Sequence, residues 1–185
     1  MTLTNIRRKG RQLNDSSLAE LALAYVGKYA TSRAKLRAYL SRKIRERGWD
    51  GSKTPDLDAL ANRLSELGYV DDAAYALGKA RSLAARGFGK RRLADKLRVD
   101  GIDESDRAAA DAHADDQSLD AALRFAERRR LGPFASVPAD QQQRQKWIAA
   151  MVRAGHDMAI ARAIATLPPE PDADAKALKE RLYVR

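Results

Sequence analysis

Large apolar residues recur three or four positions apart through most of this chain, which is the spacing of one face of an α-helix. Leu36, Leu40 and Ile44 show it most simply, because each lies about one helical turn after the last. The same spacing recurs at residues 18–29, 57–67, 73–84, 93–97, 119–126, 147–152 and 158–166. No segment combines strict alternation with β-branched residues, so the pattern predicts an all-α fold without strands.

Three of these helical segments end in the same kind of tripeptide, with a glycine, one variable residue and an aspartate. The tripeptides are Gly48-Trp49-Asp50, Gly101-Ile102-Asp103 and Gly155-His156-Asp157. Their glycines are 53 and 54 residues apart, and a nearly constant period of that length is typical of tandem helical repeats. Glycine ends helices well because it adopts a left-handed conformation without strain.

This period divides the chain into five segments. We expect a flexible basic arm at residues 1–16, repeats at 17–53, 54–102 and 103–167, and a loosely ordered tail at 168–185. Within that tail, Leu178, Leu182 and Tyr183 could add a last helical turn or two. Each repeat has too little apolar surface to form a stable core alone, so stacking against its neighbours should complete that core. The predicted architecture is an elongated array of three tandem three-helix repeats.

Capping residues predict where several helices begin. Ser17, followed three residues later by Glu20, should cap the first helix, and Thr31 or Ser32 should cap the second. Asp71 is expected to cap a helix in the second repeat, and Asp103 one in the third.

The charge of the chain is positive and unevenly distributed. The net charge is +10, and residues 1–53 alone hold 13 Lys and Arg against 4 Asp and Glu. A basic end of this kind is attracted to nucleic acid, to acidic protein grooves or to anionic lipid, and it also occurs as a solvated face. The chain has no cysteine, no apolar run long enough for a membrane span and no apolar signal-peptide core near its start. We therefore expect a cytoplasmic protein, and a monomer is the simplest assembly.

The second repeat carries the most specific group of residues. It reads Gly68-Tyr69-Val70-Asp71-Asp72-Ala73-Ala74-Tyr75, then Arg86-Gly87-Phe88-Gly89-Lys90-Arg91-Arg92-Leu93, then Leu97 and Gly101-Ile102. This ordered set resembles the central signature of the RecX family of bacterial recombinase regulators. The resemblance is close over residues 68–102 and looser over residues 20–166.

The resemblance implies an all-helical, elongated and curved molecule that binds the RecA filament on single-stranded DNA. It implies modulation, mostly inhibition, of RecA ATP hydrolysis, strand exchange and SOS co-protease activity, and hence a role in DNA repair and homologous recombination. It implies no enzymatic activity. Free DNA is a further candidate partner.

The signature residues are expected to be mainly structural. Asp71 should be a helix cap, Asp72 a favourable charge at the helix N-terminus, Tyr69 a staple across the helix start, and Tyr75 a core side chain. Phe88 should anchor the corner between Gly87 and Gly89. The complete structural signature is Gly68, Tyr69, Asp71, Asp72, Tyr75, Gly87, Phe88, Gly89, Leu93, Leu97 and Gly101.

Two groups of basic residues are the candidate contacts for the RecA filament or its DNA. The first surrounds the Gly87-Phe88-Gly89 turn and consists of Arg81, Arg86, Lys90, Arg91 and Arg92. The second lies in the first repeat and includes Lys35, Arg37, Arg42 and Lys43. Each group also has an ordinary interpretation as a solvated surface, which the sequence leaves open.

Catalytic and cofactor sites find no support in the sequence. Gly87-Phe88-Gly89-Lys90 lacks the spacing and the following Ser or Thr of a phosphate-binding loop. The adjacent Asp71 and Asp72 point in different directions on a helix, and His113 and His156 lack the spacing of a metal pair. We expect no catalytic residue, no cofactor and no metal.

Two other functions remain open at this stage. Three-helix units with a basic last helix also resemble helix-turn-helix modules, although that helix lacks an Asn- or Gln-rich face for reading bases. A helical scaffold for a different protein partner is the third possibility.

Overall fold

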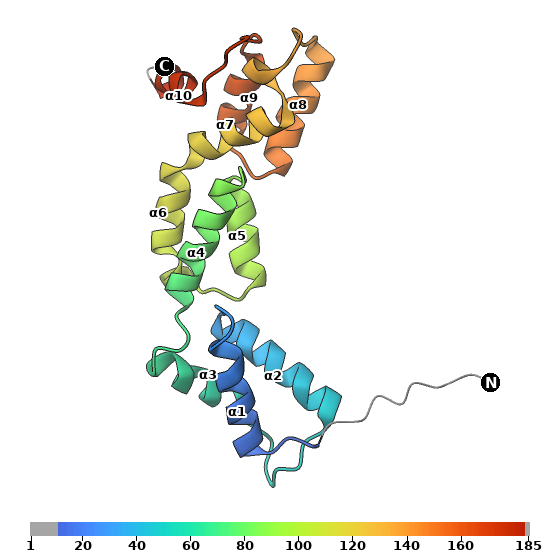
Figure 1. The fold of residues 1–185 in the computed structure, drawn as a ribbon, viewed down its shortest axis with the longest axis vertical. Helices are drawn as coiled ribbons and strands as arrows, with labels where there is room; N and C mark the ends of the chain where they lie inside the picture. Colours follow the sequence, from blue (N-terminus) through green and yellow to red (C-terminus); the bar gives the residue numbers. More distant parts are fainter. Residues whose placement is uncertain (1–10, 184–185) are drawn as a thin grey trace, which may run out of the picture. The chain divides into compact units, whose positions relative to one another are not determined.

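A computed structural model describes residues 11–183, and within this range the backbone is helical apart from loops and one isolated bridge (Figure 1). The α-helices are α1 (Asp15–Val26), α2 (Arg33–Arg47), α3 (Leu57–Glu66), α4 (Asp72–Ala85), α5 (Lys90–Val99), α6 (Ala108–Asp116), α7 (Ser118–Arg129), α8 (Gln141–Arg153), α9 (Met158–Thr166) and α10 (Ala175–Tyr183). Two short 3-10 helices are η1 (Glu104–Asp106) and η2 (Gly132–Phe134). The all-α fold predicted from the spacing of apolar residues is confirmed.

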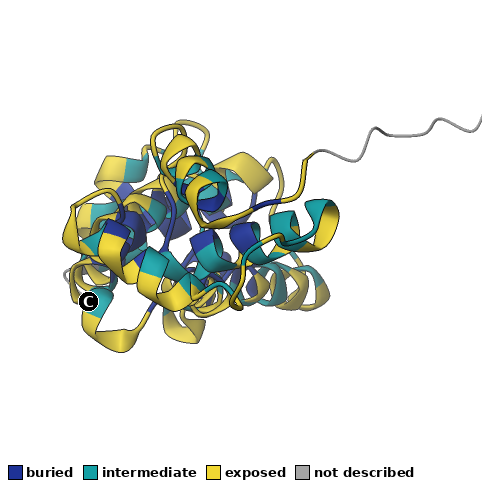
Figure 2. Ribbon diagram, turned by 90° about the horizontal axis from the view of Figure 1, so that it is seen from below, coloured by how far each residue is buried: buried dark blue, intermediate teal, exposed yellow. Residues whose placement is uncertain are grey.

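The chain divides into two compact units, residues 1–75 and residues 76–185, and the division falls within α4. Each unit has an apolar cluster of its own. The helices carry buried residues on one side and exposed residues on the other, as amphipathic helices around a core do (Figure 2).

The core of the first unit is made by α1, α2 and α3. Its buried members are Leu13, Leu18, Ala22, Leu36, Leu40, Ala61, Leu64 and Val70. Burial of each large side chain contributes roughly 1.5–3 kcal/mol before conformational entropy is subtracted. Helix α3 packs on α2 in this unit, although the repeat period places residues 57–66 in the second repeat. The expected boundary between residues 53 and 54 therefore does not coincide with a division in the packing.

The expectation of a flexible arm over residues 1–16 does not hold for residues 11–16. Residues 1–10 lie outside the described range, but Leu13 is fully buried and pairs with the segment that follows α2. The Leu13 N–H donates to the Gly48 carbonyl at 3.0 Å, and the Asp50 N–H donates to the Leu13 carbonyl at 2.8 Å. A single buried leucine between polar neighbours gives no helical or strand period, which is why the sequence did not reveal this contact.

Two of the four capping predictions were wrong in their residue. Asn14 caps α1, because its Oδ1 accepts from the Ser17 N–H at 3.0 Å. Ser17 completes the capping box, because its Oγ accepts from the Asn14 N–H at 2.9 Å. Asp103 precedes η1 without a capping hydrogen bond, and α6 begins only at Ala108. Ser32 and Asp71 cap α2 and α4 as expected.

The second unit contains a large cluster at its C-terminal end. Helices α7, α8, α9 and α10 supply its buried side chains, which include Leu123, Ile148, Met151, Ile164 and Leu178. The segment 168–185, which we expected to be loosely ordered, contains α10, and Leu178 on that helix is only 1% exposed.

Small side chains dominate the other end of the second unit. Ala80, Ala84, Leu93, Ala114 and Ala121 surround one small hollow, so α4, α5, α6 and α7 meet there. Alanine faces let helices approach closely, which gives this region dense packing with few large side chains.

The main chain of the Gly87-Phe88-Gly89 turn touches the main chain of the third Gly-X-Asp tripeptide. The Gly89 N–H donates to the Ala154 carbonyl at 3.0 Å, and the Arg91 N–H donates to the Gly155 carbonyl at 3.1 Å. A Cβ on Gly89 would lie 2.2 Å from the Gly155 oxygen, a distance that real contacts do not reach. The contact therefore requires glycine at position 89.

Replacement of Gly89 by alanine should destabilise the second unit. We expect Gly89→Ala to lose about 1–3 kcal/mol of unfolding free energy, because the backbone at Gly155 must move. The control is Gly78→Ala on α4, where a Cβ meets nothing within 4 Å and should stabilise the helix by about 0.5–1 kcal/mol. Urea unfolding followed by circular dichroism measures the unfolding free energy of both variants. Equal effects of the two substitutions would contradict the close contact.

Candidate partner-binding surfaces

Five cationic side chains lie on and beside the turn that joins α4 to α5. We call them the loop patch: Arg81, Arg86, Lys90, Arg91 and Arg92, all of them exposed. The guanidinium carbons of Arg86 and Arg92 lie 5.2 and 5.9 Å from the centre of the Phe88 ring. Cation–π attraction thus holds these two cations near the ring.

The other three members of the loop patch differ in their surroundings. Lys90 Nζ lies 2.8 and 2.7 Å from the two carboxylate oxygens of Asp115 on α6. Arg81 lies on α4, about a turn and a half before Arg86. Neither Arg81 nor Arg91 forms an ion pair with any residue in the range 11–183. Most of the positive charge of this patch is therefore available to an external anion.

The position of these cations is unfavourable for α5 itself. Lys90, Arg91 and Arg92 are the first three residues of the helix, where its dipole favours negative charge. The C-terminal carbonyls of Ala154 and Gly155 offset part of this cost, because they accept hydrogen bonds from the N-terminus of α5. The helix dipole therefore does not account for three cations at this position.

His156 fixes the same turn from the other side. Its side chain is 2% exposed, and Nε2 donates to the Gly87 carbonyl at 3.1 Å. The Phe125 ring meets the imidazole edge-on, with 5.4 Å between the ring centres. Burial lowers the pKa of His156 below its ordinary value, and the hydrogen bond to Gly87 opposes this shift but is the smaller effect. The imidazole is therefore neutral near pH 7.

The tyrosines of the signature take opposite roles. Tyr75 is buried at 6% exposure, as expected. Tyr69 is 55% exposed, so the expected staple across the helix start is wrong; its neighbour Val70, at 2% exposure, fills the core position. The Asp71 carboxylate accepts from the Ala74 N–H at 2.8 Å, which confirms the cap.

Asp72 has a partner that the sequence did not suggest. Asp72 is 6% exposed, and its carboxylate accepts from both the backbone N–H and the side-chain Nε of Arg33, each at 2.9 Å. Asp72 thereby joins the start of α4 to the start of α2. The two residues are 39 positions apart and no local pattern connects them, so only the fold reveals this pair.

The second basic group lies on α2 in the first unit and is less free. We call it the α2 face: Lys35, Arg37, Arg42 and Lys43. Arg37 pairs with Asp58 on α3. Glu46 lies 2.7 Å from Lys43 Nζ and 3.6 Å from Arg42 Nε. Exposed pairs of this kind are worth about 0–1 kcal/mol, so an anionic partner can replace them.

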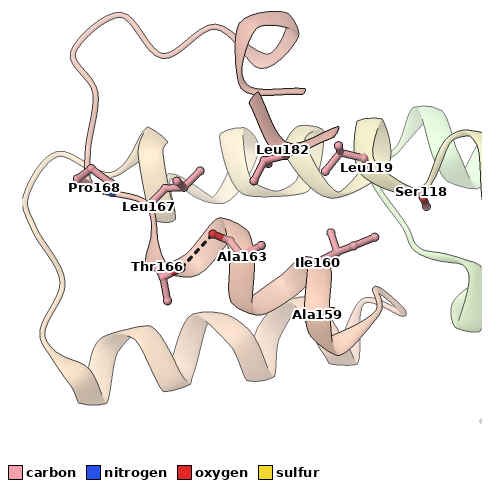
Figure 3. A pocket seen from close by; sticks show the side chains of 9 residues that line it. All are labelled: Ser118, Leu119, Ala159, Ile160, Ala163, Thr166, Leu167, Pro168 and Leu182. Atoms are coloured by element: carbon pink, nitrogen blue, oxygen red, sulfur yellow. Dashed lines mark hydrogen bonds between the residues drawn. The ribbon is translucent and has the colours of Figure 1, made fainter. Parts of the chain in front are cut away.

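An apolar hollow in the second unit lies between α7, α9 and α10 (Figure 3). Its volume is about 680 Å³, and Leu119, Ile160, Leu167 and Leu182 line it. The Thr166 hydroxyl is directed to the helix carbonyls of Arg162 and Ala163 at 3.0 and 3.1 Å and is thus occupied. The lining offers packing surface but no set of acid, base or nucleophile.

Residues 11–183 contain no group of three or more His, Cys, Asp or Glu side chains placed to hold a metal ion. Within the same range, none of the helices has the length and apolar character needed to cross a lipid bilayer.

The geometry defines an all-helical protein with an exposed cationic patch at a tightly packed turn and a second, partly paired cationic face on α2. No family model matches the chain. The chain is 32% identical over 165 residues to Regulatory protein RecX of Myxococcus xanthus, covering 85% of this chain and 88% of that relative. It is 34% identical over 143 residues to Regulatory protein RecX of Halorhodospira halophila, covering 76% and 83%. The chain belongs to the RecX family.

A solved structure supports the fold. The crystal structure of RecX from Lactobacillus salivarius matches 80% of this chain and 92% of its own length with a TM-score of 0.64. The identity is 18%, so this match concerns the fold alone. The curated relatives are named as regulatory proteins, which agrees with the expectation of a regulator.

The buried histidine predicts a pH dependence of stability. The unfolded imidazole takes up a proton at a higher pH than the folded one, so the unfolded state gains protons first as the pH falls. The free energy of unfolding should decrease below about pH 7 and level off once the folded imidazole is also protonated.

We expect the His156→Gln variant to lose less unfolding free energy at acidic pH than the wild type does. Glutamine supplies an amide donor for the Gly87 carbonyl and does not titrate. Urea unfolding near neutral pH and at mildly acidic pH measures the difference. The control is His113→Gln on α6, which removes the other histidine without touching the turn. An unchanged acid sensitivity in His156→Gln would contradict the assignment.

Proposed function

We propose that this protein is a non-enzymatic regulator that binds the RecA filament on single-stranded DNA and inhibits RecA ATP hydrolysis, strand exchange and SOS co-protease activity. Family membership supports a regulatory role. The observation that carries the proposal is the loop patch, where exposed cations surround Phe88 at a helix end that they do not stabilise.

The proposed mechanism is multivalent contact. A RecA filament on DNA repeats the same anionic and protein surfaces at each protomer. The loop patch and the α2 face belong to separate compact units of one covalent chain, so a first contact raises the effective concentration of the second. Bridging of protomers would hinder filament growth or the motions that accompany ATP turnover. The positive charge would speed encounter and make binding sensitive to salt.

The alternative of a helix-turn-helix module is less well supported. In such modules the N-terminal part of the second helix enters the major groove and contacts base edges. The corresponding end of α5 is instead occupied, because the N–H groups of Gly89 and Arg91 are bound to the carbonyls of Ala154 and Gly155. Its exposed side chains are cations suited to phosphates more than to a particular sequence.

The direct test is RecA ATP hydrolysis on single-stranded DNA with increasing amounts of this protein. We expect inhibition by micromolar wild-type protein, and its half-inhibiting concentration should rise about tenfold or more in the combined variant Arg86→Glu, Arg91→Glu, Arg92→Glu. Each reversal removes an attraction of about 0.5–1 kcal/mol and adds repulsion.

A matched control reverses three exposed cations elsewhere in the second unit, Lys146, Arg162 and Lys176, to glutamate. It has the same net charge as the patch variant and should inhibit nearly as the wild type does. Absence of inhibition by the wild type would refute the proposed function. Equal inhibition by all three proteins would show that the loop patch is only a solvated surface.

A further inference from the structure

Three of the chain's six tyrosines form a row in the first unit. Tyr25 on α1 lies in the middle. The ring of Tyr39 on α2 stacks on it with 4.0 Å between centres and 15° between planes. The ring of Tyr29, just after α1, also contacts the Tyr25 ring, with 5.3 Å between centres and 48° between planes. The row thus presents aromatic surface contributed by two helices.

Cations stand at both ends of this row. Lys28 Nζ lies 5.4 Å from the centre of the Tyr29 ring. At the other end, Arg42 Cζ and Lys43 Nζ lie 5.6 and 5.8 Å from the centre of the Tyr39 ring. We call these three tyrosines and three cations the tyrosine–cation surface.

Core packing explains only part of this arrangement. Tyr25 and Tyr39 are half-buried and pack against the apolar cluster of the first unit. Tyr29 is 50% exposed and does not belong to that cluster. The Tyr29 ring, with the Lys28 ammonium over it, gains little for folding, and its exposed surface is open to another planar group.

We propose that the tyrosine–cation surface binds single-stranded nucleic acid directly, with a base stacked on Tyr29 and adjacent phosphates near Lys28 and Arg42. Aromatic faces and cations in alternation are the elements by which proteins hold single strands without reading their sequence. A duplex hides the faces of its bases, and an acidic peptide would use the cations but not the rings. This inference extends the proposed function, and the choice of single-stranded DNA as the ligand rests on that function.

Glu46 places an internal limit on this binding. Its carboxylate pairs with both Arg42 and Lys43, so the cations at the Tyr39 end are partly neutralised in the free protein. A single strand would compete with Glu46 for them. Removal of this carboxylate should therefore strengthen the binding of single strands. If the ion pairs of Glu46 served stability alone, its removal would only destabilise the first unit.

The test measures fluorescence anisotropy of a labelled oligothymidylate of about 16 nucleotides with the full chain, at low salt and without RecA. Tyr29→Ala should weaken binding by about fivefold or more through the loss of one base–aromatic stack. Tyr69→Ala is the matched control, because Tyr69 is also in the first unit and is 55% exposed. It should bind as the wild type does, and Glu46→Gln should bind more tightly.

An oligonucleotide of abasic sites separates stacking from charge. It keeps the phosphates, so the wild type should bind it more weakly than oligothymidylate, and Tyr29→Ala should bind it as well as the wild type. Equal effects of Tyr29→Ala and Tyr69→Ala on oligothymidylate, or equal affinity of the wild type for both oligonucleotides, would overturn the inference.

The RecA assay distinguishes this inference from the proposed function. If Tyr29→Ala binds free single strands normally but fails to inhibit RecA, the surface contacts RecA protein, and the inference is overturned while the function stands. If the wild type binds single strands through Tyr29 but leaves RecA ATP hydrolysis unchanged, the inference holds and the proposed function fails.

Discussion

The approach of the main chain at Gly89 to the main chain at Gly155 determines where the loop patch lies. Only glycine at position 89 leaves room for it, and two backbone hydrogen bonds pass across it. These bonds satisfy N–H groups at the start of α5 that its own helix cannot satisfy. His156 adds a third bond, to the Gly87 carbonyl. The turn that carries Phe88 is thus held from both sides.

This contact gives the Gly-X-Asp tripeptide a second role. The sequence suggests only that Gly155-His156-Asp157 ends a helix, and the positive φ of 95° at Gly155 and the cap that Asp157 provides for α9 agree with that role. The same residues also receive the N-terminus of α5. The repeat period of the sequence indicates the first role, because ending a helix depends on the local backbone. The period does not indicate which distant segment docks on the tripeptide.

Local features of the fold were therefore predictable and long-range ones were not. The four-residue spacing of Leu36 and Leu40 correctly placed them in a core, and Asp71 was correctly identified as a cap because its hydrogen bond spans three residues. The pair of Asp72 with Arg33 and the burial of Leu13 depend on segments far apart in sequence. For the candidate surfaces, sequence indicated the cations but not their partners, and the tyrosine row needs two helices to form.

The function proposed for the loop patch depends on a rigid Gly87-Phe88-Gly89 turn, since a fixed turn presents the patch in one arrangement. Hydrogen–deuterium exchange tests this rigidity most directly at the amides of Gly89 and Arg91, which in an ordinary helix N-terminus exchange rapidly. Both amides should be protected to the same degree as core amides of α8. Exchange as fast as that of the exposed loop residues 136–137 would contradict it.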